Sequence, residues 1–510
     1  MKKTVYFFAF ILLVNPMAAQ SPYSGLEQRL TLIADSLTQH LKEWNVPAGV
    51  FQVQDYGAVG DGKAINTAAI QKAIDACFVA GGGTVLVSNG KYATGTIELK
   101  SNVMLEVAEN AEIWGSTDLA DYPDKVENFK SIVSEIHKYR ISLIYAERAV
   151  NTGICGKGAI NFRGEKEHFP GPETTTAIEG RPFGIRMIEC RNVVIKDITL
   201  RNAAAWMQSY LYCENLIFDG IKVFNQVNYN NDGLDPDGCR NVIIRNCFIS
   251  SHDDAMCLKG ASAKPCENIL IENSTFYSTC NALKLGTDTQ GDFRNIIARN
   301  LILGGLPDSL ASFKNLYECS TGITLATVDG GNVENILIRD VEINRSRCPV
   351  FIRIGSRGRR WDETMTQPGY LKDIVIENVT GTENRRQGSF ITGIKDRMIE
   401  NVLIKNMDIS MVGGGSAEMV NQPVAEDEKG YPDAQEFSRE GLPAYGFYIR
   451  HAKNILLENV KITPEKEDLR PAFKSGGDIE NVIINGSVLE SLILNRQVAR
   501  WDGIPSPFRR

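Results

Sequence analysis

The densest group of acidic side chains in the chain lies in one short stretch, residues 228–260. Asp232, Asp235 and Asp237 occur together in a turn-like segment, and Asp253 and Asp254 follow as a pair. Carboxylates that the fold brings together repel one another, so one keeps its proton near neutral pH while others stay ionised. Such a pair can act as acid and base on one bond. The stretch is therefore a candidate catalytic site.

Two other interpretations fit the same residue types. Asp and Asn terminate strands and cap turns, and this structural role is the one that we expect for Asp237. Several carboxylates together can also bind calcium, which would suit a lyase. For Asp232, Asp253 and Asp254 we favour catalysis without a metal ion.

A short phrase recurs through the chain from about residue 150: an Asn, an apolar residue, a variable residue, an Ile-like residue, a polar residue and Asn or Asp. Most copies are 23 to 28 residues apart, with a few wider gaps. A period in the twenties indicates stacked units of one supersecondary type. The ladder positions of the copies are Asn192, Asn215, Asn241, Asn268, Asn295, Asn335, Asp373, Asn401, Asn454 and Asn481.

Each copy alternates apolar and polar residues, and most copies have no helical segment between them, which favours strands. We therefore predict an all-β, single-stranded parallel β-helix with one coil per repeat and stacked Asn at the turns. Asp253 follows Asp232 by about one coil, so the two should stack on one face. The wide gaps at 304–333, 344–371 and 410–452 are expected to be loops that shape a groove.

The N-terminal part of the chain has a different pattern. Residues 1–20 have two lysines, an apolar run and small residues, as in a cleaved signal peptide, so we expect a periplasmic or secreted protein. Residues 21–48 have apolar residues at helical spacing, which predicts a short helical cap. Residues 49–510 would form the β-helix, entered through a predicted helix over 66–79.

Composition excludes several classes of protein. The formal net charge is −7, which gives no basic field for nucleic acid, and no apolar stretch is long enough to span a membrane. The 11 cysteines are odd in number and have no shared spacing; we expect most of them to be buried core residues and leave any disulfide pairing open. A capped β-helix of this kind is expected to be a monomer.

The acidic motifs and the repeats together resemble the polygalacturonase family of glycoside hydrolases, family 28. That family carries the motifs N-T-D-G-x-D, G/Q-D-D, G-H-G and R-I-K. The first appears here as NNDGLD, residues 230–235, and the second as HDD, residues 252–254. The resemblance covers nearly the whole chain after the N-terminal segment. It implies a right-handed parallel β-helix that cleaves pectin by an inverting mechanism without a cofactor.

The resemblance also implies roles for individual residues. Asp253 would be the general acid that protonates the leaving oxygen. Asp232 and Asp254 would hold and deprotonate the attacking water. Asn230 and Asp235 would belong to the supporting and substrate-binding residues around them.

The third and fourth motifs depart from the family pattern. Asn281 stands where the family has histidine, and Arg353 is followed by Ile and Gly, so the family's lysine is missing. We expect Asn281, Lys284 and Arg353 to contact substrate, with further arginines at 357, 359 and 360 able to bind carboxylates. His252, beside the acid, is a further candidate for contact with sugar.

These observations predict an exported hydrolase that acts on a pectic polysaccharide or oligosaccharide containing galacturonate. The departures in the third and fourth motifs leave a rhamnogalacturonan or side-chain hydrolase open. A calcium-dependent pectate lyase and a non-catalytic polysaccharide-binding β-helix are further alternatives. Endo or exo action and the exact linkage stay open at this stage.

Overall fold

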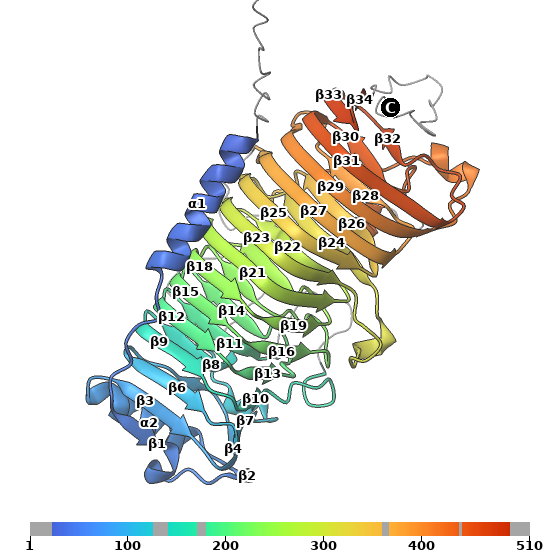
Figure 1. Cartoon of the computed structure of the whole chain (residues 1–510). Coiled ribbons are helices and arrows are strands. Elements are labelled where there is room, and N and C mark those ends of the chain that lie inside the picture. The colour runs from blue at the N-terminus through green and yellow to red at the C-terminus, as the bar shows by residue number, and fades with distance from the viewer. Residues whose placement is uncertain (1–22, 126–140, 171–179, 360–366, 438–440, 490–510) are drawn as a thin grey trace, which may run out of the picture.

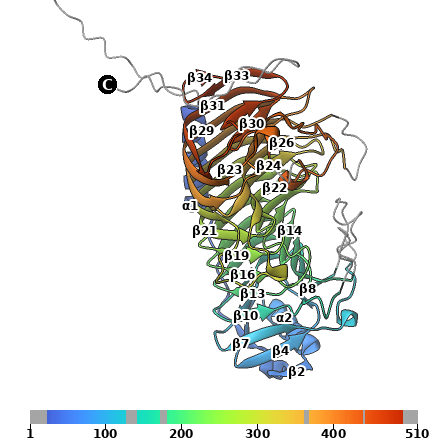
Figure 2. The same cartoon turned by 90° about the vertical axis from the view of Figure 1, so that its right-hand side faces the viewer.

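The computed structural model describes residues 23–125, 141–170, 180–359, 367–437 and 441–489 of the 510 residues. The predicted signal peptide, residues 1–20, lies outside the described residues, as do Arg360 and Trp361. The described chain is an elongated stack of strands that rises from β2 at one end to β33 and β34 at the other (Figures 1 and 2).

The strands form two long sheets in which almost every pair is parallel. The larger sheet comprises β1 (Val50–Gln52), β2 (Asp61–Ile65), β3 (Gly83–Val87), β4 (Gly90–Thr94), β6 (Val103–Val107), β7 (Ala111–Gly115), β9 (Val150–Cys155), β10 (Ala159–Asn161), β12 (Arg191–Lys196), β13 (Thr199–Arg201), β15 (Glu214–Asp219), β16 (Lys222–Asn225), β18 (Arg240–Arg245), β19 (Phe248–Ser251), β21 (Cys266–Ser278), β23 (Phe293–Gly304), β25 (Val333–Asn344), β27 (Leu371–Asn384), β29 (Ile399–Gly413), β31 (Ala452–Lys466), β33 (Ile479–Ile484) and β34 (Ser487–Val488).

The second sheet comprises β5 (Ile97–Glu98), β8 (Ser142–Glu147), β11 (Phe183–Ile188), β14 (Gln208–Leu211), β17 (Asp235–Asp237), β20 (Met256–Gly260), β22 (Asn281–Thr289), β24 (Cys319–Thr327), β26 (Ser346–Ile354), β28 (Ser389–Thr392), β30 (Phe447–Arg450) and β32 (Phe473–Ser475). The chain alternates between the two sheets with one coil per repeat. It therefore forms the right-handed parallel β-helix that the sequence predicted.

Helices are few among the described residues. The α-helices are α1 (Ser24–His40), α2 (Thr67–Val79) and α4 (Ala434–Phe437), and the short 3-10 turns are η1 (Val53–Tyr56), η2 (Leu119–Asp121), η3 (Phe313–Asn315) and η4 (Ala417–Asn421). The predicted helix over 66–79 is confirmed by α2, which packs against β1, β3, β5 and β6 at the N-terminal end of the stack (Figure 1).

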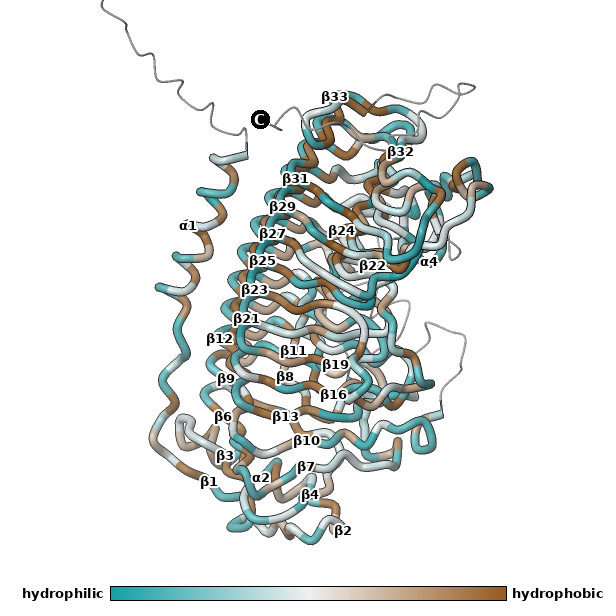
Figure 3. Tube along the Cα trace, turned by 45° about the vertical axis from the view of Figure 1, so that its right-hand side comes forward, coloured by the Kyte–Doolittle hydropathy of each residue, from teal (hydrophilic) through white to brown (hydrophobic). Residues whose placement is uncertain are grey.

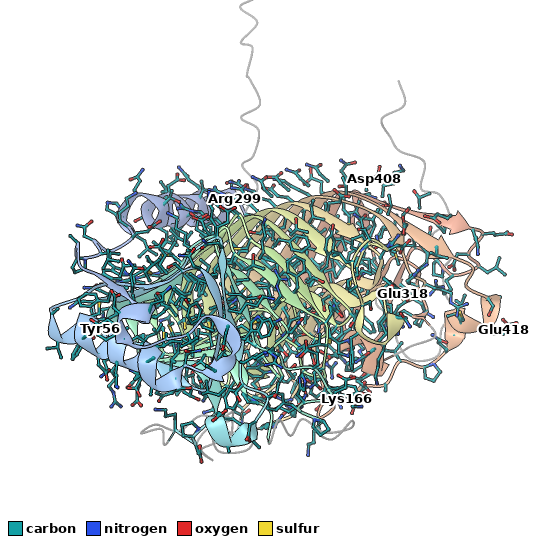
Figure 4. All side chains as sticks on the ribbon, turned by 90° about the horizontal axis from the view of Figure 1, so that it is seen from below. Tyr56, Lys166, Arg299, Glu318, Asp408 and Glu418 are labelled. Carbon is teal, nitrogen blue, oxygen red and sulfur yellow. The ribbon has the colours of Figure 1, made fainter. Side chains whose placement is uncertain are left out.

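One apolar core runs the length of the coil, because each inward residue stacks on its counterpart in the next repeat. In β18, Val242 and Ile244 point into this core and pair with Ile269 and Ile271 of β21. Apolar positions recur along successive strands in Figure 3, and side chains fill the inside of the coil in Figure 4. The stack thus lengthens without needing a wider core.

The predicted Asn stack is present and begins earlier than the sequence pattern indicated. Asn102 and Asn151 start it, and except at Asp373 each side-chain amide then donates to the side-chain oxygen one coil below, for example Asn268 Nδ2 to Asn241 Oδ1 at 3.2 Å. The ladder residues have positive φ, 56° at Asn268, a backbone conformation that Asn tolerates better than most residues. Asn therefore both turns the chain and bonds successive coils.

The helix expected from residues 21–48 forms as α1, but it lies along the flank of the coils and does not cover an end of the stack (Figures 1 and 3). Leu30, Ala34 and Leu37 are buried on it. They pack against one outward residue from each of six coils, namely Ile243, Leu270, Ile297, Leu337, Val375 and Leu403. The helix thus covers an apolar stripe that the larger sheet leaves on its outer face.

The three wide gaps are not simple loops, which corrects that expectation. The 304–333 gap contains β24 and the 344–371 gap contains β26, while most of the 410–452 gap is irregular and ends in β30. The strands of the second sheet lack the recurring Asn phrase and so escape a search for it. All eleven cysteines have free thiols, and nine of them are buried, which confirms the expectation of a core role.

Candidate active site

The acidic residues singled out in the sequence come together on the second sheet. Asp232 precedes β17, and Asp253 and Asp254 precede β20, one coil further along. The backbone joins the two turns, because Gly233 N donates to the Asp254 carbonyl at 2.9 Å and Asp253 N to the Asn231 carbonyl at 3.3 Å. The predicted stacking of the two acidic turns is therefore present.

A glycine makes this close approach possible. A Cβ atom on Gly233 would lie 2.4 Å from Ile249 Cγ2 and 2.5 Å from the Ala255 carbonyl oxygen. Both contacts are far inside van der Waals distance, so a larger residue would push Asp232 away from the next coil.

The three aspartates line one pocket of the molecule. Its other lining residues are Trp206, Asn230, Lys259, Thr287, Asp288, Arg359 and Tyr431. Trp206 comes from the coil below, before β14, and Tyr431 comes from the irregular segment after β29. The pocket therefore combines an acidic floor with an aromatic side chain from each direction along the stack.

A buried lysine neutralises the lower part of the acidic floor. Lys259 Nζ lies 3.1 Å from Asp232 Oδ2 and 3.4 Å from Asp235 Oδ1. Burial raises the pKa of Asp232, and the Lys259 ammonium opposes that rise. Burial likewise raises the pKa of Asp235 to about 7. Asp235 thus lies beneath the pocket as a partner of Lys259.

A second buried lysine neutralises the upper part. Lys284 Nζ lies 3.1 Å from Asp254 Oδ2, and Asn281 Nδ2 donates to Asp254 Oδ1 at 2.6 Å. Burial alone would raise the pKa of Asp254, but Lys284, Lys259 and Asn281 together hold it below its usual value. Asp254 is accordingly ionised. Asn281 and Lys284 contact this carboxylate directly instead of lining the pocket.

Asp253 differs from its neighbour Asp254, because its surroundings favour the protonated form. Burial and the neighbouring Asp254 carboxylate raise its pKa to about 6, against the opposing charges of Lys284 and Lys259. Asn230 Nδ2 lies 3.4 Å from Asp253 Oδ2, and Arg181 holds the oxygen of the same amide at 2.8 Å. Adjacent carboxyl groups with pKa values driven apart are the arrangement that acid and base catalysis uses.

His252 points to one side of the pocket and is not among its lining residues. Its ring packs on Phe313, 4.8 Å between centroids, and on Tyr229 at 6.1 Å. Burial and the nearby Lys314 lower its pKa to about 4, so the ring is neutral. It forms part of an aromatic wall beside Asn230.

Arg353 occupies a different place from the one expected. Its guanidinium is fully buried, stacks 4.1 Å from Phe437 and donates to the carbonyl oxygens of Glu426 and Asp427. It therefore fastens the segment after β29 and does not line the pocket. Arg353 lies on β26, in a stretch expected to be a loop, and the insert that covers this arginine has no counterpart in the motif.

Of the expected arginines, Arg359 alone among the described residues lines the pocket. Arg357 is held by Asp329, 2.6 Å from Nη2 to Oδ2, and by Asp288 at 3.1 Å. Asp237 accepts a hydrogen bond from Ser262 at 3.1 Å beneath the surface, in keeping with the structural role expected for it.

Asp253, Asp254 and Cys280 lie close enough together to be considered as metal ligands. Calcium takes about six to eight oxygen ligands, whereas this group offers a thiol, and Lys284 and Asn281 already occupy Asp254. The donor set does not fit calcium.

Comparisons with known proteins agree with this geometry. Residues 83–428 match the sequence profile described as Glycosyl hydrolases family 28. The chain belongs to this family. It is a glycoside hydrolase, and residues 50–106 also match the profile described as Rhamnogalacturonase A/epimerase, pectate lyase-like.

Relatives of this glycoside hydrolase include a probable polygalacturonase of Vitis vinifera, 24% identical over 70% of this chain and 73% of that protein. An exo-poly-alpha-D-galacturonosidase of Dickeya chrysanthemi is 28% identical over 71% of this chain and 68% of its own. The crystal structure of an exopolygalacturonase from Thermotoga maritima superposes with a TM-score of 0.66 at 20% identity, covering 85% of this chain and 96% of that one. The comparison with the Thermotoga maritima structure shows that the two proteins share a fold.

Several site residues had weak sequence signals or none. Lys259 follows the second motif on β20, and its position after that motif marks it in the sequence as a basic residue able to replace the missing lysine. Trp206 lies about one coil before the first acidic motif, where an aromatic residue is more often part of the core, and Tyr431 lies far from both motifs in sequence. Asp433, which contacts Lys284, lies in an insert without a repeat pattern and had no signal.

Proposed function

We propose that the protein is an exported inverting hydrolase of α-glycosidic bonds in galacturonate-containing pectin. The observation that carries this proposal is the contrast between two adjacent aspartates in one pocket. The surroundings of Asp253 favour its protonated form near pH 6, while those of Asp254 favour the carboxylate. Family membership and the polygalacturonase relatives supply the substrate class.

In the proposed reaction, the Asp253 carboxyl group donates its proton to the glycosidic oxygen as the bond to the anomeric carbon breaks. Asp232 and Asp254 hold a water and accept its proton as it attacks from the opposite face. Asp232 Oδ1 is buried and has no hydrogen-bond partner among the described residues, so it can accept a hydrogen bond from that water. Inverting enzymes need space for a water between their carboxyl groups.

We assign the uronate carboxylate to Arg359. Its guanidinium lines the pocket, with Nη1 3.8 Å from Asp288 Oδ1, and its side chain is 24% exposed. Arginine binds carboxylates with two parallel hydrogen bonds. Arg359 thus binds the carboxylate in place of the family's lysine, which this chain lacks, and of Arg353, which is buried away from the pocket. Arg359→Lys should raise KM for galacturonate polymers more than it lowers kcat.

The signal-like pattern of residues 1–20 supports the export that we propose. Among the described residues, no helix is long and apolar enough to cross a membrane. N-terminal sequencing of the protein recovered outside the cytoplasm should begin near residue 20 or 21. An intact Met1 on exported protein would contradict cleavage.

The substrate is tested with purified protein, a chelator, and either polygalacturonan or rhamnogalacturonan. The proposal predicts new reducing ends from polygalacturonan, no rise in ultraviolet absorbance, and a first-formed product of inverted anomeric configuration by NMR. A preference for rhamnogalacturonan would favour the second candidate, which the match at residues 50–106 supports. Absorbance that needs calcium would identify a lyase and overturn the proposal.

A further inference from the structure

One acidic residue beside the catalytic aspartates comes from a distant insert. Asp433 Oδ1 lies 2.9 Å from Lys284 Nζ, and the same ammonium group is 3.1 Å from Asp254 Oδ2. All three side chains are at most 5% exposed. A buried ammonium group that bridges two carboxylates is held far more firmly than one with a single partner.

The insert that carries Asp433 comprises residues 414–437 and is called the 414–437 segment below. It is fastened to the second sheet at several points. Arg353 donates to its carbonyl groups at Glu426 and Asp427. Arg450, two strands further along the same sheet, donates to those at Val424 and Ala425, each at 3.0 Å. The two arginines thus pin the stretch just before Asp433.

On the other side of Asp433 the chain enters α4, whose apolar residues are buried. Ala434 and Phe437 pack into an aromatic cluster, with Phe437 5.9 Å from both Phe351 and Phe390 between ring centroids. Gln387 Nε2 donates to the Ala434 carbonyl at 2.6 Å. Asp433 is therefore fixed from both sides.

We propose that Asp433 is a positioning residue of the active site, which the 414–437 segment delivers so that its carboxylate holds the Lys284 ammonium against Asp254. This inference rests on the proposed function, because it assigns Asp254 a part in activating water. It also gives Arg353 a role: the arginine secures the segment that completes the site.

The charges of this pair act on the catalytic acid in opposite directions. Asp433 raises the pKa of Asp253, and Lys284 lowers it. Lys284 also lowers the pKa of Asp254. The groups that act on Asp253 are Asp254, Lys284, Lys259 and Asp433, and those that act on Lys284 are Asp254, Asp433, Tyr431 and Cys280.

The test is the pH dependence of kcat/KM on polygalacturonan for Asp433→Asn and Lys284→Gln. Asp433→Asn removes a negative charge and should move the alkaline limb to lower pH by about half a unit to one unit. Lys284→Gln should move both limbs to higher pH. Both variants should lower kcat about tenfold to a hundredfold, because Asp254 loses its fixed position.

Two further variants guard against general effects on folding. Glu436→Gln removes an exposed negative charge three residues away on the same segment and should leave the pH profile unchanged. Lys284→Gln combined with Asp433→Asn removes both charges of the pair. Because Lys284 acts more strongly on Asp253 than Asp433 does, its alkaline limb should lie between those of Lys284→Gln and the wild type while kcat stays low.

An Asp433→Asn profile that coincides with those of Glu436→Gln and the wild type would overturn the inference. So would shifts of the alkaline limb in the same direction for the two single variants. A wild-type protein that releases no reducing ends from any pectic polymer would overturn the proposed function instead, so the two failures are distinguishable.

Discussion

Asp253 and Asp254 are adjacent in sequence but differ in their surroundings. Asp254 receives hydrogen bonds from Asn281 and Lys284, which stabilise its charge. Asp253 has the weaker contact with Asn230 and faces the pocket. One residue step along the chain therefore separates a carboxyl group whose pKa is raised from one whose pKa is lowered.

This contrast predicts the pH dependence of catalysis. A general acid works only while it carries its proton, and the pKa of Asp253 is raised to about 6. The value of kcat/KM should therefore fall as the pH rises through about 6. A profile measured from about pH 4 to about pH 8 checks this, and activity that increases up to the alkaline end would contradict the assigned acid.

The acidic trio could be predicted from sequence because its residues lie in two short motifs one coil apart. Asp433 could not, because its contact with Lys284 joins positions 149 apart along a path set by the insert. Arg353 lies on β26, within a stretch that was expected to be a loop, and the same insert covers it. Long-range contacts of an irregular segment leave no periodic trace in the sequence.

At the scale of elements, the Asn ladder explains why the coils stay in register. Each ladder residue combines a left-handed backbone with an amide bond to the next coil. The ladder is interrupted at Asp373, whose carboxylate has no N–H to donate to Asn335. There Arg29 of α1 donates to Asn335 Oδ1 at 2.6 Å, so the helix supplies the hydrogen-bond donor that Asp373 lacks.

Replacement of one ladder residue should lower stability in two separable ways. Asn268→Ala loses amide bonds to both neighbours and places alanine at positive φ, which together should lower the free energy of unfolding by about 2 to 4 kcal/mol. Asn268→Gly keeps the backbone conformation without strain and should cost less. Denaturant unfolding of both variants checks this; equal stability of the alanine variant and the wild type would show that the ladder contributes nothing.

Strand prediction succeeded where the Asn phrase marks a coil and failed for the second sheet. Strands such as β24 and β26 are buried at all or nearly all positions and carry no ladder residue, so the sequence pattern assigns them to long gaps. Their alignment comes from pairing with neighbouring coils. The recurring phrase therefore reports one side of the coil only.

For the whole molecule, α1 and the pocket lie on opposite sides of the stack. Figure 4 shows Arg299 and Asp408 on the side of α1 and Lys166 on the other. Lys166 lies 5.1 Å from the Tyr229 ring, next to Asn230 of the pocket. The helix therefore stabilises the stack without contributing to the site.

Two leucines of α1 provide a matched test of this role. Leu30 is fully buried against the coils, whereas Leu32 is 62% exposed. Leu30→Ala should lower the free energy of unfolding by about 2 to 5 kcal/mol, and Leu32→Ala should change it by less than about 0.5 kcal/mol. Both should keep wild-type kcat. Equal effects of the two substitutions on thermal unfolding would show that the helix does not pack on the stripe in solution.

A comparison of Asp253→Asn with Asp237→Asn on polygalacturonan tests whether Asp253 is the general acid. Asp237 is also buried, and burial raises its pKa to about 8, so its amide variant closely mimics the protonated side chain. We predict that kcat falls about a hundredfold to ten-thousandfold for Asp253→Asn, with unchanged thermal unfolding, and stays near the wild-type value for Asp237→Asn. Near-normal turnover by Asp253→Asn would contradict the account.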